Sequence, residues 1–350
     1  MSKPPRRLES SVTPVVFAAI ALLVASGCGK REESAPAADT GAQSSPVAQA
    51  ATPAAAVAET PAAEPAPKPA ATAKAVISAP RPRGNWPSWR GPLQTGVSLE
   101  QYQEMSFDPK PAWTYEVSGR GTPVIFEGQV YAFGYRIRSN EDVREYLSAL
   151  DEDSGELIWE NEYIEFMSDT VYNRYAVGSP CVDVETKNVY HLLSNGTFSC
   201  FSREGELLWE HSLMERFGRL SFPNGRAGAP VVEGDLVIVR GVTSYWGKQG
   251  PARDRFLAFD KRSGDLVWTS TPGVGPPFLK DSSFSTPFFE TRGGRRVFYV
   301  GLGCGNVACI SADSGEPLWR YQAAKGGINS SPVVHGGDKL IYINDKVNVH

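Results

Sequence analysis

The sequence contains few residues of the kinds that hold metals or carry redox chemistry. Its 350 residues include five cysteines and four histidines. No two cysteines stand in a CxxC or CxxCH spacing, and the histidines are scattered. These shortages argue against a zinc site, a catalytic cysteine or a covalently attached haem. The formal net charge of −4 is too small to indicate a bulk affinity for nucleic acid.

A hydrophobic run long enough to span a membrane is missing near the N-terminus. The apolar run Val15–Ala25 falls short of the roughly 20 residues that a spanning helix needs. With Arg6 and Arg7 before it, the run is typical of a secretory signal. The "ASGC" that follows resembles the lipobox of bacterial lipoproteins, which implies a signal peptide over residues 1–27 and a lipid on Cys28. An ordinary signal peptide and a twin-arginine signal are the alternatives.

Residues 28–84 are predicted to be a lipid-anchored, disordered linker. Ala, Pro, Ser, Thr and Glu dominate this stretch, so it cannot bury enough apolar surface to offset the entropy of ordering. As a flexible coil it would reach on the order of 40 Å. The exported chain would then be held at the membrane, in the periplasm or at the outer membrane, with a folded domain over residues 85–350.

One stretch recurs four times in the folded part. "ALDEDSGELIW" begins at Ala149, and its copies begin at Cys200, Ala258 and Cys309. Each copy has a glycine followed four residues later by a tryptophan. The glycines are Gly155, Gly205, Gly264 and Gly315, and the tryptophans are Trp159, Trp209, Trp268 and Trp319. A further tryptophan, Trp113, lies one period upstream, and a period of this size indicates a propeller or a solenoid.

A small-small-proline step lies between successive tryptophans and precedes an apolar strand. The steps end at Pro123, Pro180, Pro230, Pro287 and Pro332. Each unit continues with a turn and a second strand, and Asn195-Gly196 is a strong hairpin signal in the second unit. Four antiparallel strands per period of about 50 residues make a propeller blade. We therefore predict an all-β protein, a β-propeller of four-stranded antiparallel blades with about five blade units, preceded by a disordered tether.

The repeat resembles the tryptophan-docking motif A-x-D-x-x-[ST]-G-x-x-x-W of the PQQ-like (quinoprotein-type) β-propeller repeat family. One unit fits it at every position, with Ala258, Asp260, Ser263, Gly264 and Trp268. The unit at Cys200 is one residue short, and the unit at Cys309 has Ser311 in place of Asp. The stretch "NWPSWRGP" from Asn85 is also similar to the opening of this group. The resemblance covers most of residues 85–350 and is specific for the fold, but weak for function.

The motif is explained without a metal. Asp151 and Asp153 look like the start of a calcium loop, but the copies replace Asp151 by Ser or Asp153 by Arg262. An Asp or Ser accepts backbone N–H groups across a tight turn, and Gly supplies the positive φ there. The next strand then brings the tryptophan to the interface between blades, where it buries roughly 150–250 Å². The tryptophans and glycines are therefore expected to be structural docking residues.

The cysteines of the folded part fit the same frame. Cys200 and Cys309 occupy the position that Ala149 and Ala258 hold, so we expect small buried residues. Cys181 follows a proline step and is also expected in the core. Cys304 lies close to Cys309 across a predicted turn, which leaves a disulfide between them open.

Counting strands assigns the loops to two faces. The turns between first and second strands share one face with the "SG" turns, and all are short. The loops between second and third strands and between blades share the other face, and the long ones cover residues 135–145, 166–178, 214–228, 243–255 and 273–285. Basic and aromatic residues on this face suit protein segments or anionic ligands, although an ordinary solvated rim has the same composition. The candidate binding face consists of Arg120, Arg174, Arg226, Lys280, Lys325, Tyr172, Tyr175 and Trp246.

The resemblance implies two main functions. BamB-type outer-membrane assembly lipoproteins scaffold protein partners, so we expect a non-enzymatic, membrane-tethered scaffold that binds a protein partner through the long-loop face, with no cofactor and no catalytic or metal-ligating residue. The alternative is a PQQ-dependent quinoprotein oxidoreductase, for which the resemblance implies PQQ and calcium in the central funnel. The chain has no adjacent cysteine pair and no recognisable set of calcium ligands for that role. A glycan-binding or glycan-processing propeller is a second alternative, without paired carboxylates to support it.

The last repeat ends within a blade, at "LIYINDKVNVH". The resemblance implies seven or eight blades, whereas the proline steps mark five starts. Two interpretations are open at this point: a truncated larger propeller, or a five-bladed ring in which the Trp113 segment completes the last blade.

Overall fold

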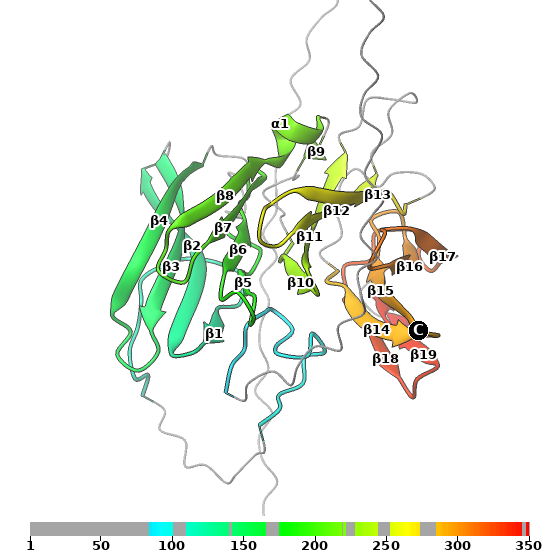
Figure 1. Ribbon diagram of the computed structural model, residues 1–350, viewed down its shortest axis with the longest axis horizontal. Helices are drawn as coiled ribbons and strands as arrows, with labels where there is room; N and C mark the ends of the chain where they lie inside the picture. The colour runs from blue at the N-terminus through cyan, green and yellow to red at the C-terminus, as the bar shows by residue number, and fades with distance from the viewer. Residues whose placement is uncertain are drawn as a thin grey trace, which may run out of the picture. The chain divides into compact units, whose positions relative to one another are not determined.

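The structure is a computed structural model. It describes residues 84–100, 110–139, 142–165, 175–218, 220–221, 228–243, 253–273, 285–344 and 348–349. Within these ranges almost all regular structure is β-strand (Figure 1). The same ranges contain no helix that is both long and apolar enough to cross a membrane. The predicted signal peptide and nearly all of the predicted linker lie outside them, so the lipid on Cys28 stays a prediction.

Four sheets of four antiparallel strands follow one another along the chain. The first contains β1 (Val124–Phe126), β2 (Gln129–Ser139), β3 (Asp142–Asp151) and β4 (Leu157–Glu165). The second contains β5 (Cys181–Val182), β6 (Val189–Leu192), β7 (Thr197–Phe201) and β8 (Leu207–Ser212). The third contains β10 (Val231–Glu233), β11 (Leu236–Thr243), β12 (Asp254–Asp260) and β13 (Leu266–Ser270), with β9 (Leu220–Ser221) beside β11. The fourth contains β14 (Phe288–Arg292), β15 (Arg295–Gly301), β16 (Asn306–Ser311) and β17 (Pro317–Gln322).

A fifth unit begins after Pro332. In it β18 (Val333–His335) pairs with β19 (Lys339–Ile341), and β20 (Ile343–Asn344) pairs with β21 (Asn348–Val349). In the four complete sheets the strands are ordered as in the sequence, which is the meander of a propeller blade. The predicted all-β fold of four-stranded antiparallel blades is confirmed.

The repeat sets the strand register in every complete blade. Ala149 pairs with Trp159, Cys200 with Trp209, Ala258 with Trp268, and Cys309 with Trp319. Immediately after the small residue the register shifts in all four blades. One extra residue at that point bends the strand and re-aims the side chains that follow. The recurring sequence therefore encodes a recurring bulge as well as a turn.

The tryptophan of one blade packs on the glycine turn of the next. A Cβ atom built on Gly205 would lie 2.7 Å from Cγ of Trp159, and one on Gly315 would lie 2.5 Å from Cε3 of Trp268. Both glycines have positive φ, +87° and +72°. The indole of Trp159 also donates from Nε1 to the carbonyl of Arg203 at 2.8 Å. Only glycine meets both demands, which explains the invariant spacing in the four units.

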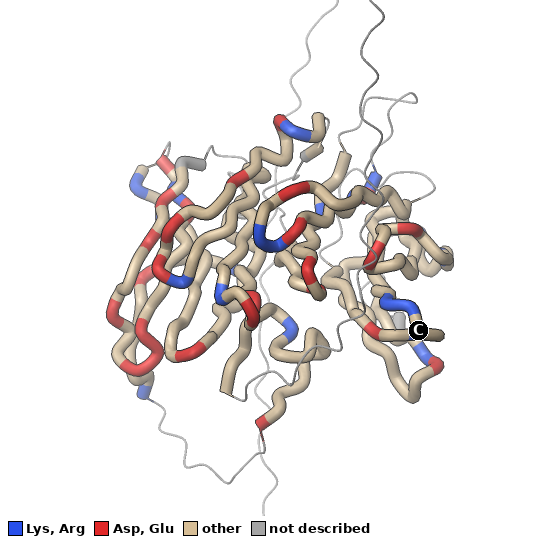
Figure 2. The backbone as a smooth tube through the Cα atoms, viewed as in Figure 1, with Lys and Arg blue, Asp and Glu red and all other residues tan. Residues whose placement is uncertain are grey.

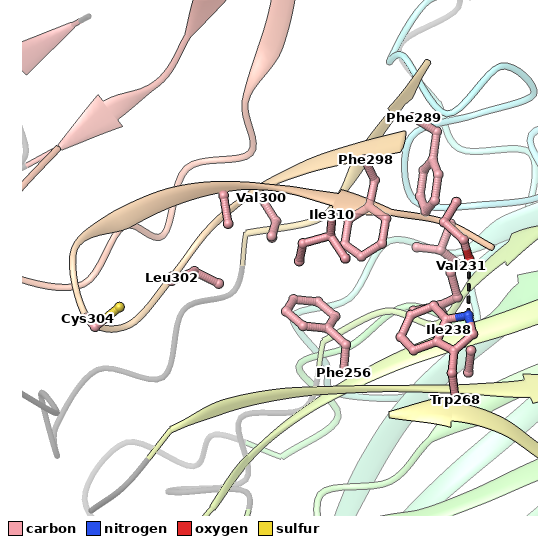
Figure 3. Close-up of a cluster of buried hydrophobic side chains, with 13 residues drawn as sticks. Val231, Ile238, Phe256, Trp268, Phe289, Phe298, Val300, Leu302, Cys304 and Ile310 are labelled. Carbon is pink, nitrogen blue, oxygen red and sulfur yellow. Dashed lines mark hydrogen bonds between the residues drawn. The ribbon is translucent and has the colours of Figure 1, made fainter. Parts of the chain in front are cut away.

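Apolar clusters join successive sheets. One spans the first and second sheets around Phe133 and Phe201, and another spans the second and third around Phe198 and Phe259. Figure 3 shows the cluster between the third and fourth sheets, where Phe256 and Trp268 face residues of β14 to β16. The core is thus divided among the blade interfaces, so stability depends on each interface in turn.

Two glycine substitutions separate backbone strain from the loss of this packing. Gly128 has φ +80° and an open surrounding, whereas Gly205 has φ +87° and faces Trp159. Gly128→Ala is expected to cost about 1–2 kcal/mol, the penalty for a left-handed non-glycine residue. Gly205→Ala is expected to cost at least about 2 kcal/mol more, because the new methyl group displaces the indole. Urea unfolding of both variants measures the difference, and equal losses would contradict the docking of Trp159.

The carboxylate of the repeat stabilises its own turn. Oδ1 of Asp151 accepts the backbone N–H of Ser154 at 2.8 Å and that of Asp153 at 3.1 Å. These hydrogen bonds, the one from the Ser154 backbone first, lower the pKa of Asp151. Asp260 accepts two backbone N–H groups in the same way. In both turns the carboxylate thus satisfies backbone N–H groups of its own turn.

Two predicted loops contain regular structure. Residues 135–145 were expected to form a loop, and this is wrong, because β2 and β3 stay paired up to Ser139 and Asp142. The predicted loop over 214–228 holds most of α1 (Leu213–Phe217), whose N-cap is Ser212.

The described cysteines are all free and buried, so Cys304 and Cys309 form no disulfide.

Candidate functional site

The short-turn face is used for contacts between blades. The backbone N–H of Glu152 in the "SG" turn donates to the carbonyl of Gly128 in the first turn, and the same contact recurs in the third and fourth blades. This confirms that the two kinds of turn share a face. Ion pairs bridge the neighbouring blades there: Glu127 with Lys187 and Arg203, Asp183 and Glu185 with Lys261, and Glu233 with Arg296. Charges of both signs are accordingly interspersed along the chain (Figure 2).

The residues of the candidate binding face do not form one described surface. Arg120 and Lys325 are exposed, and the backbone N–H of Arg120 donates to the carbonyl of Ala176 at 3.2 Å. Tyr175 is only 1% exposed and packs on Tyr135, so it belongs to the core. The other members lie outside the described residues: Tyr172, Arg174, Arg226, Trp246 and Lys280.

Buried acids connect the blades at the long-loop end. Glu145 on β3 is fully buried and accepts hydrogen bonds from the backbone and side chain of Ser194 in the β6–β7 turn of the next blade. Asp254 on β12 holds the same repeat position, four residues before the small residue. It accepts the backbone N–H of Gly303 in the β15–β16 turn at 2.7 Å. The sequence signal that could have revealed these acids is an Asp or Glu four residues before the small residue of the repeat, which occurs in the first and third units.

The buried Arg240 is paired with an acid in this interface. It forms an ion pair with Asp254 and donates to the carbonyl of Gly301 at 3.1 Å. Its guanidinium also lies over the ring of Phe256. Because an acid already neutralises this arginine, the pair holds the third and fourth blades together and is a poor candidate for binding a ligand.

The opening segment, residues 84–98, crosses the first strands of several blades, and we call it the strap. Trp86 exchanges two backbone hydrogen bonds with Ile125 of β1, and the carbonyl of Pro87 accepts from Val182 of β5 at 2.7 Å. Arg90 lies over Phe288 of β14 and donates from Nη1 to the carbonyl of Pro332 at 3.1 Å. In Figure 1 the strap is the cyan segment between β1 and β14. It therefore connects the inner strands of the first, second, fourth and fifth units.

The strap has its own fixed structure. A Cβ atom on Gly91 would lie 2.8 Å from the ring of Trp86, so the indole packs on the backbone of this glycine. Oγ of Ser88 donates to the carbonyl of Gly91 at 2.8 Å and lies 3.1 Å from the amide oxygen of Gln94. Ser88, Arg90 and Gln94 are all buried. Arg90 is thus presented by a folded segment.

Arg90 is a buried cation without an acid beside it. Its side chain is 5% exposed, and no ion pair joins it to any acid of the described residues. Burial alone lowers its pKa, because no carboxylate offsets the loss of water. The stretch "NWPSWRGP" resembles the opening of the family, but its pattern predicts no role for Arg90. The residue that touches Arg90 most directly, Pro332, is 242 positions away, so no local pattern reveals the contact.

A second cluster lies on the first blade. Arg136 forms an ion pair with Glu160 at 2.9 Å and lies over the rings of Tyr115 and Tyr146. A hollow of about 560 Å³ opens beside it, lined by Tyr115, Glu116, Val117, Ser118, Tyr135, Arg136 and Ile137. Arg136 donates hydrogen bonds to the carboxylate of Glu160, and these raise the pKa of Arg136, so an acid already balances its charge. Among the arginines of the described part, Arg90 is therefore the better candidate for an external anion.

The family match now decides the classification. The model of the family described as outer membrane protein assembly factor BamB matches residues 106–248 and 252–348. The chain belongs to this family. Membership of the PQQ-like β-propeller repeat family, expected from the tryptophan-docking motif, is thereby confirmed.

Relatives of this BamB-family chain include alcohol-oxidising enzymes. The quinohemoprotein alcohol dehydrogenase ADH-IIG of Pseudomonas putida is 23% identical over 317 residues, which cover 72% of this chain and 40% of the relative. A europium-containing methanol dehydrogenase has a similar structure, with a TM-score of 0.52 and 14% identity over 74% of this chain and 54% of that one. The quinohemoprotein alcohol dehydrogenase of Comamonas testosteroni aligns with a TM-score of 0.48 and 16% identity, over 74% and 46% of the two chains.

These comparisons correct the expected function. A non-enzymatic scaffold was expected, but the curated relative is an alcohol dehydrogenase, so that expectation is wrong. The chain spans less than half of this relative's length. The solved structures are too distant in sequence to show more than the propeller fold.

Proposed function

We propose that the chain forms the propeller part of a quinoprotein-type oxidoreductase that oxidises an alcohol. The observation that carries this proposal is the similarity to a quinohemoprotein alcohol dehydrogenase over 317 residues, most of the folded part. A propeller built from docked blades is a rigid frame on which loops hold a ligand.

The described residues fit one part of the implied cofactor. PQQ is an anionic quinone with several carboxylates, and Arg90 on the strap is a buried cation with no ion pair to an acid of the described residues. Calcium prefers six to eight oxygen ligands, and no described cluster of acids offers a start for such a set. When bound, the quinone would take up the two electrons and two protons that an alcohol loses on oxidation to a carbonyl compound. The role of the chain's own residues is to bind and orient the anion.

Reconstitution tests the proposal. The purified full chain is incubated with PQQ and calcium, and quinone binding is followed by quenching of tryptophan fluorescence. Reduction of an added dye by ethanol or methanol is then measured. We expect saturable quinone binding and dye reduction that requires PQQ, calcium and alcohol together.

Two controls make the test decisive. Omission of PQQ and addition of a chelator should each abolish dye reduction, while the fold, followed by circular dichroism, stays unchanged. Absence of saturable quinone binding to a well-folded chain would reject the proposed function. Binding without alcohol-dependent dye reduction would reject the oxidation of these alcohols by the chain.

A further inference from the structure

We propose that Arg90 forms a carboxylate-binding site on the inner strands of the propeller, presented by the strap. The site consists of the guanidinium of Arg90, the ring of Phe288 beneath it and the carbonyl of Pro332 that fixes one of its nitrogens. This inference is independent of alcohol oxidation, since it requires only a small molecule that carries a carboxylate.

The cost of burying a bare cation favours an anionic ligand here. Arg90 as a residue is only 5% exposed, so its guanidinium loses much of its hydration, and one hydrogen bond to a carbonyl at 3.1 Å offsets little of that loss. Arg240 and Arg136 show how this chain handles arginines that serve structure alone: each has an acid within hydrogen-bond distance. Arg90 lacks that acid in the described structure, so an incoming anion would complete its environment.

Two donor groups of Arg90 are free to receive such an anion. Nη1 donates to Pro332, while Nε and Nη2 form no hydrogen bond with the described residues. An Arg presents these donors as a planar fork that matches the two oxygens of a carboxylate.

Charge and surroundings favour a carboxylate over a phosphate. One guanidinium neutralises the single charge of a carboxylate, whereas a phosphate carries about 1.5–2 negative charges and would leave an excess near the partly buried ring of Phe288. The ring of Phe288 lies 5.3 Å from the guanidinium carbon and limits access of water to one side of the fork. Hydrogen bonds are stronger in such a partly desolvated position.

The strap holds the fork in place before a ligand arrives. The contacts of Trp86 with Gly91 and of Ser88 with Gly91 fix the backbone on both sides of Arg90. A prepositioned side chain loses less conformational entropy on binding, which favours affinity for small ligands. The carboxylates of PQQ and those of a smaller organic acid offer the same chemistry, and the experiment separates these sources.

The test compares three ligands on the full chain. Isothermal titration at fixed ionic strength measures binding of PQQ, of benzene-1,3,5-tricarboxylate and of inorganic phosphate, without calcium. Arg90→Gln removes the charge, Arg90→Lys keeps the charge and loses the fork, and Lys339→Gln is the control at an exposed cation on β19. We expect carboxylate affinity to fall at least tenfold in Arg90→Gln, to fall less in Arg90→Lys and to be unchanged in Lys339→Gln.

Each outcome has a defined meaning. Arg90-dependent binding of PQQ alone supports the site with the quinone as its ligand, and Arg90-dependent binding of both carboxylates supports a general carboxylate site. Failure of alcohol oxidation leaves either result standing. Tighter binding of phosphate, equal carboxylate binding by wild type and Arg90→Gln, or no binding at all would overturn the inference. If Arg90→Gln fails to fold, a folded Arg90→Lys that binds carboxylates as tightly as wild type would overturn it as well.

Discussion

Trp268→Ala is expected to lower the free energy of unfolding by about 3–5 kcal/mol. The indole is 8% exposed and packs on Gly315, and its Nε1 donates to the carbonyl of Ala312 at 3.1 Å. It also belongs to the apolar cluster between the third and fourth sheets, which includes Phe256 and Phe298 (Figure 3). The substitution therefore removes buried area, leaves a cavity and frees a buried carbonyl.

Trp319→Ala is the matched control for this prediction. Trp319 holds the same position in the fourth repeat and pairs with Cys309 in the same register, but it is 44% exposed. Its removal should cost no more than about 1 kcal/mol, because much of the ring stays in water in the native state. Urea titrations followed by circular dichroism measure both losses without relying on tryptophan fluorescence. Similar losses for the two variants would show that docking on the next glycine turn contributes little.

The blade architecture could be predicted from the sequence because the determinants of the repeat are local. The glycine of positive φ, the acid that caps the turn and the tryptophan all lie within eleven residues of one another, as in Ala149–Trp159. Their structural partners lie at a fixed offset, since the Trp159 indole reaches Gly205 of the next unit. Because the motif occurs four times, its interpretation in one unit applies to all four. The copies also argue against a calcium loop at Asp151, because they replace its acidic residues.

The boundary between strand and loop at residues 135–145 was not predictable from polarity. Arg136, Arg138, Arg144 and Glu145 make this stretch charged, which is typical of a loop. The strands β2 and β3 nevertheless continue through it, and Arg136 and Arg138 of β2 form ion pairs with Glu160 and Glu162 of β4 on the far side of β3. Cross-strand ion pairs stabilise a polar hairpin arm in the same way that apolar pairs stabilise a buried one.

The candidate site was missed for a different physical reason. Arg90 is a candidate because it contacts Phe288 and Pro332. These residues are far from it in the sequence and reach it only in the folded chain. A lone arginine in a polar N-terminal stretch gives no sign that it will be buried. The function was mispredicted because the tryptophan-docking motifs specify only the propeller fold. The same fold occurs in binding proteins and in enzymes.

His191 is expected to make the protein sensitive to acid. The residue lies on β6, is fully buried, and has no hydrogen-bond partner for either ring nitrogen within the described residues. Its ring packs against Phe133 at 5.3 Å, Tyr163 at 5.4 Å and Phe201 at 5.8 Å. Burial among these rings lowers the pKa of His191 to about 3. The imidazole is therefore neutral in the folded protein and fills space as an aromatic ring.

The unfolded chain binds a proton at this histidine once the pH falls below about 6.5, whereas the folded chain does not until about pH 3. Stability contributed by the neutral ring is thus complete above pH 6.5 and is lost as the pH falls, by on the order of 3 kcal/mol at pH 4. His191→Phe keeps an aromatic ring and removes the proton site. We expect its loss of stability between pH 7 and pH 4 to be smaller than that of wild type by about this amount, while His335→Phe, an exposed control on β18, follows wild type. Urea titrations at the two pH values decide the question, because an unchanged pH dependence in His191→Phe would mean that the ring is protonated, or reached by water, in the native state.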